Sequence, residues 1–223
     1  MRILKILAAA AALVALPATG ALAQSGSFAL GANLGTPGVG VEAQFRVSDS
    51  LVVRGGADWL SYSRDETYSG VEYDGKLKAA TAGLFADWHL GGSAFLVSAG
   101  AYLGDRKVEL DAQPAGPVNI GGATFTPAQV GRIDGKAKMS KAQPFVGLGF
   151  DNTFTSEGAW GFRALAGVSL SKAPDVSLRA SGGTLSNDPT FQARLRQEEA
   201  DLQDDADDFK YYPIVQIGVT RRF

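Results

Sequence analysis

A strict two-residue alternation of apolar and polar side chains recurs along this sequence. Between Val39 and Val47 every odd position is apolar, whereas the even positions carry glycine or one of the polar residues Glu42, Gln44 and Arg46. Successive side chains of a β-strand point to opposite faces of a sheet. The pattern therefore predicts a strand whose two faces meet different surroundings.

Seven further segments alternate in the same way, which predicts eight strands in all. Their ranges are about 28–35, 51–59, 80–90, 95–104, 143–154, 160–170 and 211–223. After the first link, short turns alternate with long loops, which are expected at about 64–75, 110–138 and 171–210. This asymmetry is typical of membrane barrels. A soluble barrel would turn its apolar faces inward, and a soluble β-sandwich, whose strands also alternate, is the alternative.

The first 23 residues have the features of a cleaved export signal. Arg2 and Lys5 precede an apolar run at 6–16, and Ala21-Leu22-Ala23 matches a small-residue cleavage site, so the mature chain would begin at Gln24. The run is too short to span a bilayer as a helix, which takes about 20 apolar residues. We therefore predict a signal peptide at 1–23 and one barrel domain at 24–223, with an uncleaved anchor as the alternative.

Charge, cysteine content and missing motifs argue against several classes of function. Without the signal the chain carries 19 basic and 23 acidic residues, a net charge of about −4, which argues against nucleic acid as a partner. The sequence contains no cysteine, so it has no disulfide, thiolate nucleophile or cysteine metal site. It also contains no G-x-S-x-G, H-E-x-x-H or phosphate-loop motif. We expect no enzyme activity, cofactor or metal.

Aromatic residues on the apolar faces cluster near the short turns and the chain ends. If both chain ends are periplasmic, we predict that six of them form a girdle at that membrane surface: Phe28, Trp88, Phe95, Phe154, Trp160 and Phe223. Aromatic rings at headgroup depth are expected of a membrane barrel. Trp59 and Tyr211 would form a thinner girdle at the opposite rim.

The predicted signal, the eight alternating strands, the long loops and the closing segment Tyr-Tyr-Pro-Ile-Val-Gln-Ile-Gly-Val-Thr-Arg-Arg-Phe resemble the small outer-membrane β-barrels of Gram-negative bacteria, the OmpA-like and OmpW-like group. The resemblance covers the mature chain as architecture, and its local motif is the last strand, which ends on Phe223. It implies an outer-membrane location, contact with membrane lipid and lipopolysaccharide, and recognition of residues 211–223 by the barrel-assembly machinery. The expected fold is an all-β, eight-stranded antiparallel up-and-down transmembrane barrel.

The alternation sends ten ionisable side chains toward the barrel interior. They are Glu42, Arg46, Arg54, Asp58, Asp87, His89, Arg106, Asp151, Arg163 and Arg222. Charges in a narrow, partly desolvated bore are best satisfied by mutual pairing, so we expect a salt-bridged plug that stiffens the barrel. The alternative is an ion or solute path near the periplasmic mouth, lined by Arg46, Arg54, Arg163 and Arg222. His89 and Asp87 have no identifiable serine partner and are expected in the plug rather than in a catalytic dyad.

The last loop is predicted to contain an amphipathic helix. Asp188 is a typical N-cap residue and Pro189 suits the first helical position. Phe191, Leu195 and Leu202 then recur near helical spacing, and we expect this stripe to pack across the outer mouth. The acidic residues between 201 and 208 lack the glycine and ligand order of a calcium loop, so they predict a solvated face rather than a metal site.

The expected function is that of a non-enzymatic outer-membrane barrel with a structural or surface-interaction role. A conduit for small, largely apolar solutes, of the OmpW-like kind, is the alternative and requires an apolar pocket under the loops. A lipid-modifying enzyme of the outer membrane is a third, more remote class.

Overall fold

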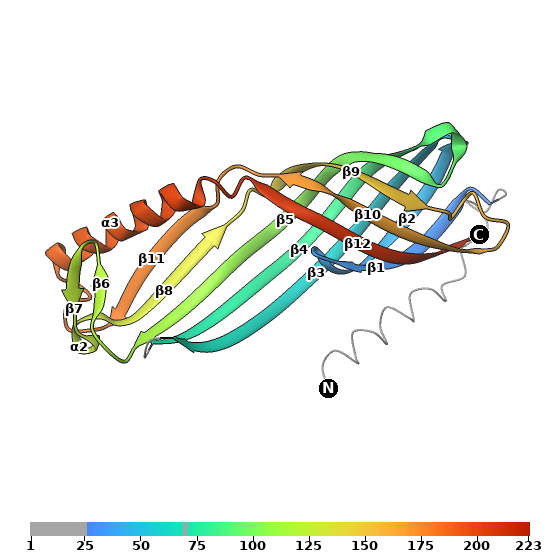
Figure 1. The fold of residues 1–223 in the computed structure, drawn as a ribbon. Helices are drawn as coiled ribbons and strands as arrows, with labels where there is room; N and C mark the ends of the chain where they lie inside the picture. The colour runs from blue at the N-terminus through green and yellow to red at the C-terminus, as the bar shows by residue number, and fades with distance from the viewer. Residues whose placement is uncertain (1–25, 69–70) are drawn as a thin grey trace.

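Eight antiparallel strands form a closed ring in the computed structural model, which describes residues 26–68 and 71–223 (Figure 1). In order around the ring they are β1 (Phe28–Gly35), β2 (Gly38–Ser48), β3 (Leu51–Tyr68), β4 (Val71–His89), β5 (Phe95–Pro114), β9 (Ala142–Asp151), β10 (Trp160–Leu170) and β12 (Tyr211–Arg222). The pairing of β1 with β12 closes the ring. The predicted all-β fold with eight ring strands is confirmed. The predicted signal and its cleavage between Ala23 and Gln24 lie outside the described residues.

The ring is uneven, because β3, β4 and β5 are about twice as long as β1. They continue beyond it as a five-stranded extension that also contains β8 (Gly131–Lys138) and β11 (Asp175–Gly182) (Figure 1). β5 pairs with β9 through residues 95–103 and with β8 through residues 107–112. Gly104 lies between the two ladders with a φ of 137°, a backbone conformation that favours glycine.

The expectation of a long loop at 64–75 is wrong, because β3 runs to Tyr68 and β4 resumes at Val71. The segment at 110–138 holds the end of β5, then β6 (Val118–Ile120), β7 (Ala123–Phe125), α2 (Pro127–Val130) and β8. The segment at 171–210 holds β11 and α3 (Pro189–Ala206). A short 3-10 helix, η1 (Leu90–Gly92), makes the turn between β4 and β5.

Helix α3 begins where the sequence predicts. The carboxylate of Asp188 accepts a hydrogen bond from the backbone N–H of Phe191 at 2.9 Å, and Pro189 occupies the first turn. Phe191 and Leu195 are buried against a cluster that includes Ile133 and Leu178 of the extension. The apolar stripe therefore packs on β8 and β11 rather than across the outer mouth, and Leu202 is exposed. Within the described residues no helix is long and apolar enough to cross a membrane.

Candidate functional site

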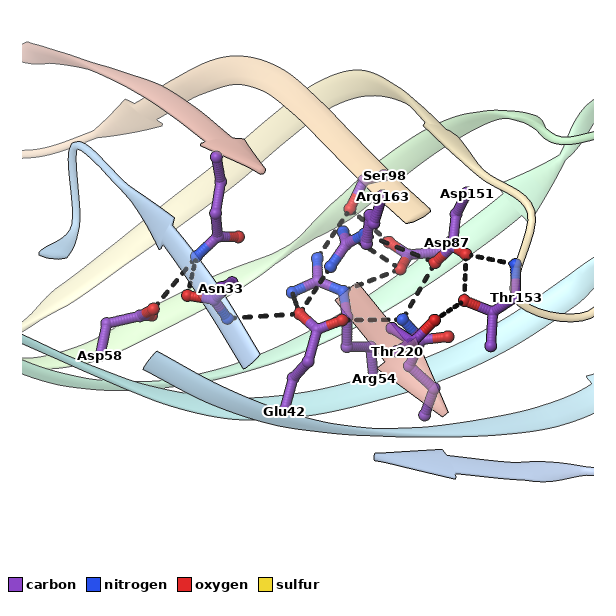
Figure 2. Close-up of polar contacts among 12 residues, drawn as sticks. Asn33, Glu42, Arg54, Asp58, Asp87, Ser98, Asp151, Thr153, Arg163 and Thr220 are labelled. Atoms are coloured by element: carbon purple, nitrogen blue, oxygen red, sulfur yellow. Dashed lines mark hydrogen bonds and ion pairs between the residues drawn. The ribbon is translucent and has the colours of Figure 1, made fainter. Parts of the chain in front are cut away.

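The interior of the ring is filled by polar side chains that every ring strand contributes (Figure 2). At its centre Glu42, Arg54, Asp87, Asp151 and Arg163 lie on five different strands and are each 5% exposed or less. The two-residue period of the strands explains this meeting, because each of these residues has inward parity. We call these five residues the charge cluster.

Arg163 is the hub of the charge cluster. Its Nη1 lies 2.8 Å from Oε2 of Glu42, its Nη2 lies 3.5 Å from Oδ2 of Asp87, and its Nε lies 3.6 Å from Oδ2 of Asp151. The first contact is a hydrogen-bonded ion pair, and the other two are longer ion pairs. One guanidinium therefore holds carboxylates from three strands together.

Arg54 is the second cation of the charge cluster. Its Nε donates to Oδ2 of Asp87 at 2.8 Å, and its Nη1 lies 3.9 Å from Oε2 of Glu42. The guanidinium carbon also stacks 4.1 Å above the ring centre of Phe85. Arg54 thus connects the charge cluster to the apolar layer beside it.

Neutral side chains donate further hydrogen bonds to the carboxylates of the charge cluster. The amide of Gln44 donates to Glu42 at 2.7 Å and to Asp151 at 2.9 Å. Ser98 donates to Asp87, and Thr153 donates to Asp151 through both its hydroxyl and its backbone N–H. Such bonds lower the cost of burying charge, because each buried carboxylate gains several donors. The inward parity of these neutral residues follows from the alternation, but the sequence alone gives no role for them.

Asp58 lies apart from the charge cluster but is also buried. Its Oδ1 accepts a hydrogen bond from Gln216 at 3.0 Å, and the same Gln216 amide donates to Asn33 at 2.9 Å. No cation of the described residues forms an ion pair with Asp58. It therefore depends on neutral donors from β12.

An apolar layer, which the alternation does not predict, lies beside the charge cluster. It comprises Phe85, Leu96, Tyr102, Phe145, Leu165 and Ile214. The rings of Phe85, Tyr102 and Phe145 meet edge to face at 4.8–5.7 Å. Inward glycines make this possible, because a Cβ atom on Gly83 or Gly100 would collide with Phe85. Ile214, which breaks the alternation of the last strand, is fully buried here.

Arg106 lies beyond the apolar layer, where the ring opens into the extension. It is 3% exposed and stacks between Tyr102 and Tyr212, with ring centres 4.9 and 4.6 Å from its guanidinium carbon. Its Nη1 donates to Gln143 at 2.6 Å. Among the described residues it makes no ion pair, so it belongs to the lumen but not to the charge cluster.

Three other predicted lumen residues lie at the opposite mouth, near the turns that precede β5 and β10. Arg222 donates to the backbone carbonyls of Ser156, Glu157 and Gly158 in the turn before β10. His89 is buried with its Nδ1 2.8 Å from the carbonyl oxygen of Ser93. Arg46 and His89 line a pocket of about 220 Å³ at this mouth. None of the three contacts the charge cluster.

Most residues of the predicted periplasmic girdle lie at this end of the barrel and face outward. Trp88, Phe95 and Trp160 are exposed on the outer surface, and Phe28 and Phe223 pair with ring centres 6.4 Å apart. Phe154 is different, because it is only 9% exposed and packs inside against Ala29 and Val52. It follows the end of β9 at Asp151, so the parity of the strand no longer fixes its direction.

The outer surface of the ring is apolar around its circumference. Leu84 of β4 is 64% exposed and Trp59 is 52% exposed, and the other seven ring strands contribute further exposed apolar residues: Leu34, Val39, Phe45, Val53, Leu103, Val146, Leu148, Phe162, Val215, Ile217 and Val219. The ring therefore buries charged residues and exposes apolar ones. In a soluble protein the arrangement is the reverse.

No protein-family model matches this sequence, and no curated protein matches it. The structure is similar to two solved structures, those of CarO2 and CarO from Acinetobacter baumannii. Each has a TM-score of 0.61 and 22% sequence identity, and the match covers 98% of the solved chain and 88% or 89% of this one. These similarities establish a shared fold, that of the CarO β-barrel.

Proposed function

We propose that this chain is a non-enzymatic outer-membrane β-barrel whose filled lumen gives it a structural or surface-interaction role. The observation that carries the proposal is the reversed polarity of the ring. A continuous apolar belt of this extent on a soluble monomer would be a liability for aggregation. In a bilayer the same belt would face acyl chains, and the closed ring leaves no strand edge unpaired within it.

The filled lumen supports a closed barrel rather than a pore. Eight strands enclose a space that side chains can fill, and here the charge cluster and the apolar layer lie one after the other along it. We expect no conductance steps when the purified protein is added to planar bilayers. Stable single-channel conductance of the unmodified protein would contradict the closed lumen.

The location can be tested separately from conductance. We expect the protein in the outer-membrane fraction, with slower migration on gels after boiling than before. Recovery from the soluble periplasm would contradict the membrane location. Outer-membrane lipid, lipopolysaccharide and the barrel-assembly machinery are the partners that this location implies.

A conduit for small apolar solutes is the second candidate. It is favoured by the lumen-side face of the extension, where Tyr62, Val108 and Leu110 are 55%, 47% and 41% exposed. These side chains continue the inward parity of β3 and β5, so they form an apolar surface next to the lumen. Uptake of an apolar dye into liposomes that contain the protein, reduced by the change Leu110→Asp, would favour the conduit over the structural role.

A further inference from the structure

The outward face of the barrel changes character where β3, β4 and β5 leave the ring. In the ring this face carries Trp59, Leu84 and Leu103. Two residues beyond Trp59 it carries Ser61, and the paired position on β4 is Lys78. Two residues along a strand correspond to about 7 Å. The apolar belt therefore has a sharp edge, with polar side chains just above it.

Outward-facing residues that lie directly opposite one another on neighbouring strands form rows across the sheet. The two rows next to this edge are basic. In the first row Lys78, Lys107 and Lys138 lie directly opposite one another on β4, β5 and β8. The second row contains Lys76, Glu109 and Lys136. Five lysines and one glutamate give these two rows on the three strands a net charge of +4, which becomes +3 when Asp175, opposite Lys138 on β11, is included. We call the five lysines the lysine rows.

The next row outward is acidic. It contains Asp74, Asp111 and Asp134 on the same three strands. The positive charge is therefore concentrated at the edge of the apolar belt rather than spread over the extension.

The charges within the lysine rows are only partly compensated. Glu109 is shared by three lysines, with Oε atoms 2.8 Å from Nζ of Lys78, 3.0 Å from Lys107 and 3.4 Å from Lys136. Lys76 pairs with Asp111 of the next row at 3.2 Å, whereas Lys138 forms no ion pair within the described part of the chain. Like charges directly opposite one another on neighbouring strands are unfavourable. Lys78, Lys107 and Lys136 have side chains 34–44% exposed, so an external anion can reach them.

We propose that the lysine rows bind the phosphate groups of outer-leaflet lipid. This inference rests on the proposed function, because insertion of the ring into a bilayer places the rows at headgroup depth. Lysine ammonium groups bind phosphate as point charges, and basic side chains beside a membrane attract anionic headgroups. A phosphate carried on a lipid fits both halves of the surface, because its acyl chains pack on the apolar belt below.

The experiment compares lipids that differ in their phosphate groups. The mature chain is refolded into phosphatidylcholine vesicles that contain spin-labelled phosphatidylcholine or spin-labelled phosphatidic acid. The motionally restricted fraction of each label gives the relative affinity for the two lipids. We expect the unmodified protein to prefer phosphatidic acid, whose phosphate is a monoester. Equal restriction of the two labels would overturn the proposal.

Charge variants test which residues are responsible. In the variant Lys78→Gln, Lys107→Gln, Lys138→Gln we expect the preference to fall by about fivefold or more, since each basic residue near an anionic surface contributes about 1 kcal/mol. The control Arg132→Gln, Arg179→Gln, Arg196→Gln removes the same charge beyond the lysine rows and should retain the preference. Equal losses in both variants would show nonspecific attraction and overturn the assignment. A lysine-to-arginine triple variant should keep the preference.

Two further readouts separate the possible failures. Millimolar inorganic phosphate should leave the preference unchanged at constant ionic strength, and its loss would indicate a site for free phosphate instead. Insertion into pure phosphatidylcholine, followed by heat-modifiable migration on gels, tests the membrane barrel itself. Failure of insertion counts against the proposed function, whereas insertion without lipid preference counts against the lysine rows alone.

Discussion

Replacement of Arg163 by methionine tests how far the charge cluster stabilises the barrel. The cluster contains three carboxylates, Glu42, Asp87 and Asp151, and two cations, Arg54 and Arg163, all nearly inaccessible to water. Without Arg163, three buried carboxylates share one guanidinium. Arg54 remains within 4 Å of Glu42 and Asp87, so Asp151 loses its only ion pair among the described residues.

The expected loss follows from the environment of these carboxylates. At an effective dielectric constant of 20, one pair of charges 4 Å apart is worth about 4 kcal/mol. Arg163 makes three such contacts, but its removal also relieves the cost of burying its own charge. Removal of one member of a buried pair typically costs about 3–5 kcal/mol. We therefore expect Arg163→Met to lower the free energy of unfolding by about 3–5 kcal/mol.

The assay is equilibrium unfolding in urea of the protein in lipid vesicles, followed by tryptophan fluorescence. Trp59, Trp88 and Trp160 all lie on the outer surface, so their emission reports transfer from lipid to water. The control Arg222→Met removes an arginine that contacts only turn carbonyls among the described residues, and it should cost clearly less.

A double variant sharpens the test. Glu42→Gln removes the carboxylate that makes the shortest contact with Arg163, so the double variant should be more stable than the sum of the two single losses predicts. We expect a coupling of at least about 1 kcal/mol. A loss below about 1 kcal/mol for Arg163→Met, or additive losses, would refute the view that the charge cluster acts as one unit.

Three further predictions concern other parts of the molecule. Leu84→Arg places a charge in the middle of the apolar belt and should destabilise the protein in vesicles by about 2–4 kcal/mol; no loss would count against a membrane location. The hydrogen bond from Lys78 lowers the pKa of Glu109 from 4.5 to about 2, so the stabilisation by Glu109 is complete above pH 4.5 and disappears as the pH falls through 2. Unfolding of Glu109→Gln should therefore differ from that of the parent by less than about 1 kcal/mol at neutral pH, with no difference at the acid limit. Asp188→Ala removes the N-cap of α3 and should cost about 1 kcal/mol locally, seen as faster amide exchange in the helix with unchanged exchange in the ring.

The ring strands could be predicted from the sequence because each separates two different environments. Residues 39–47 alternate without exception, and 211–223 alternate with Ile214 and Arg221 as the clear exceptions, so both strands and their outward faces follow. The centre of the charge cluster follows as well, since Glu42, Arg54 and Arg163 have inward parity. The ion-pair partners cannot be predicted in this way. The parity of a residue gives the direction of its side chain, but it gives neither its position along the barrel axis nor its neighbours.

The alternation does not predict the extension, and the reason is physical. From Ser61, Lys78 and Lys107 onward the outward face is polar, whereas inward positions such as Tyr62, Val108 and Leu110 are apolar, so the apolar and polar positions exchange roles. If every strand is expected to have an apolar outward face, these residues are taken for polar loops. The strands β8 and β11 are not predicted for the same reason. Phe154 departs from its predicted direction for a different reason, since it lies beyond the end of β9, where turn geometry decides the direction of the side chain.

The seam between β1 and β12 has a consequence for how the chain folds. Its seven register pairs join residues such as Ala29 and Arg222, which lie almost the whole described chain apart. Contacts of such sequence separation carry a high loop-closure entropy and form slowly. Until they form, β1 and β12 are open edges that can pair with other chains. We therefore expect sealing of the seam to be the slowest step of folding, and unsealed barrels to be the species that aggregates.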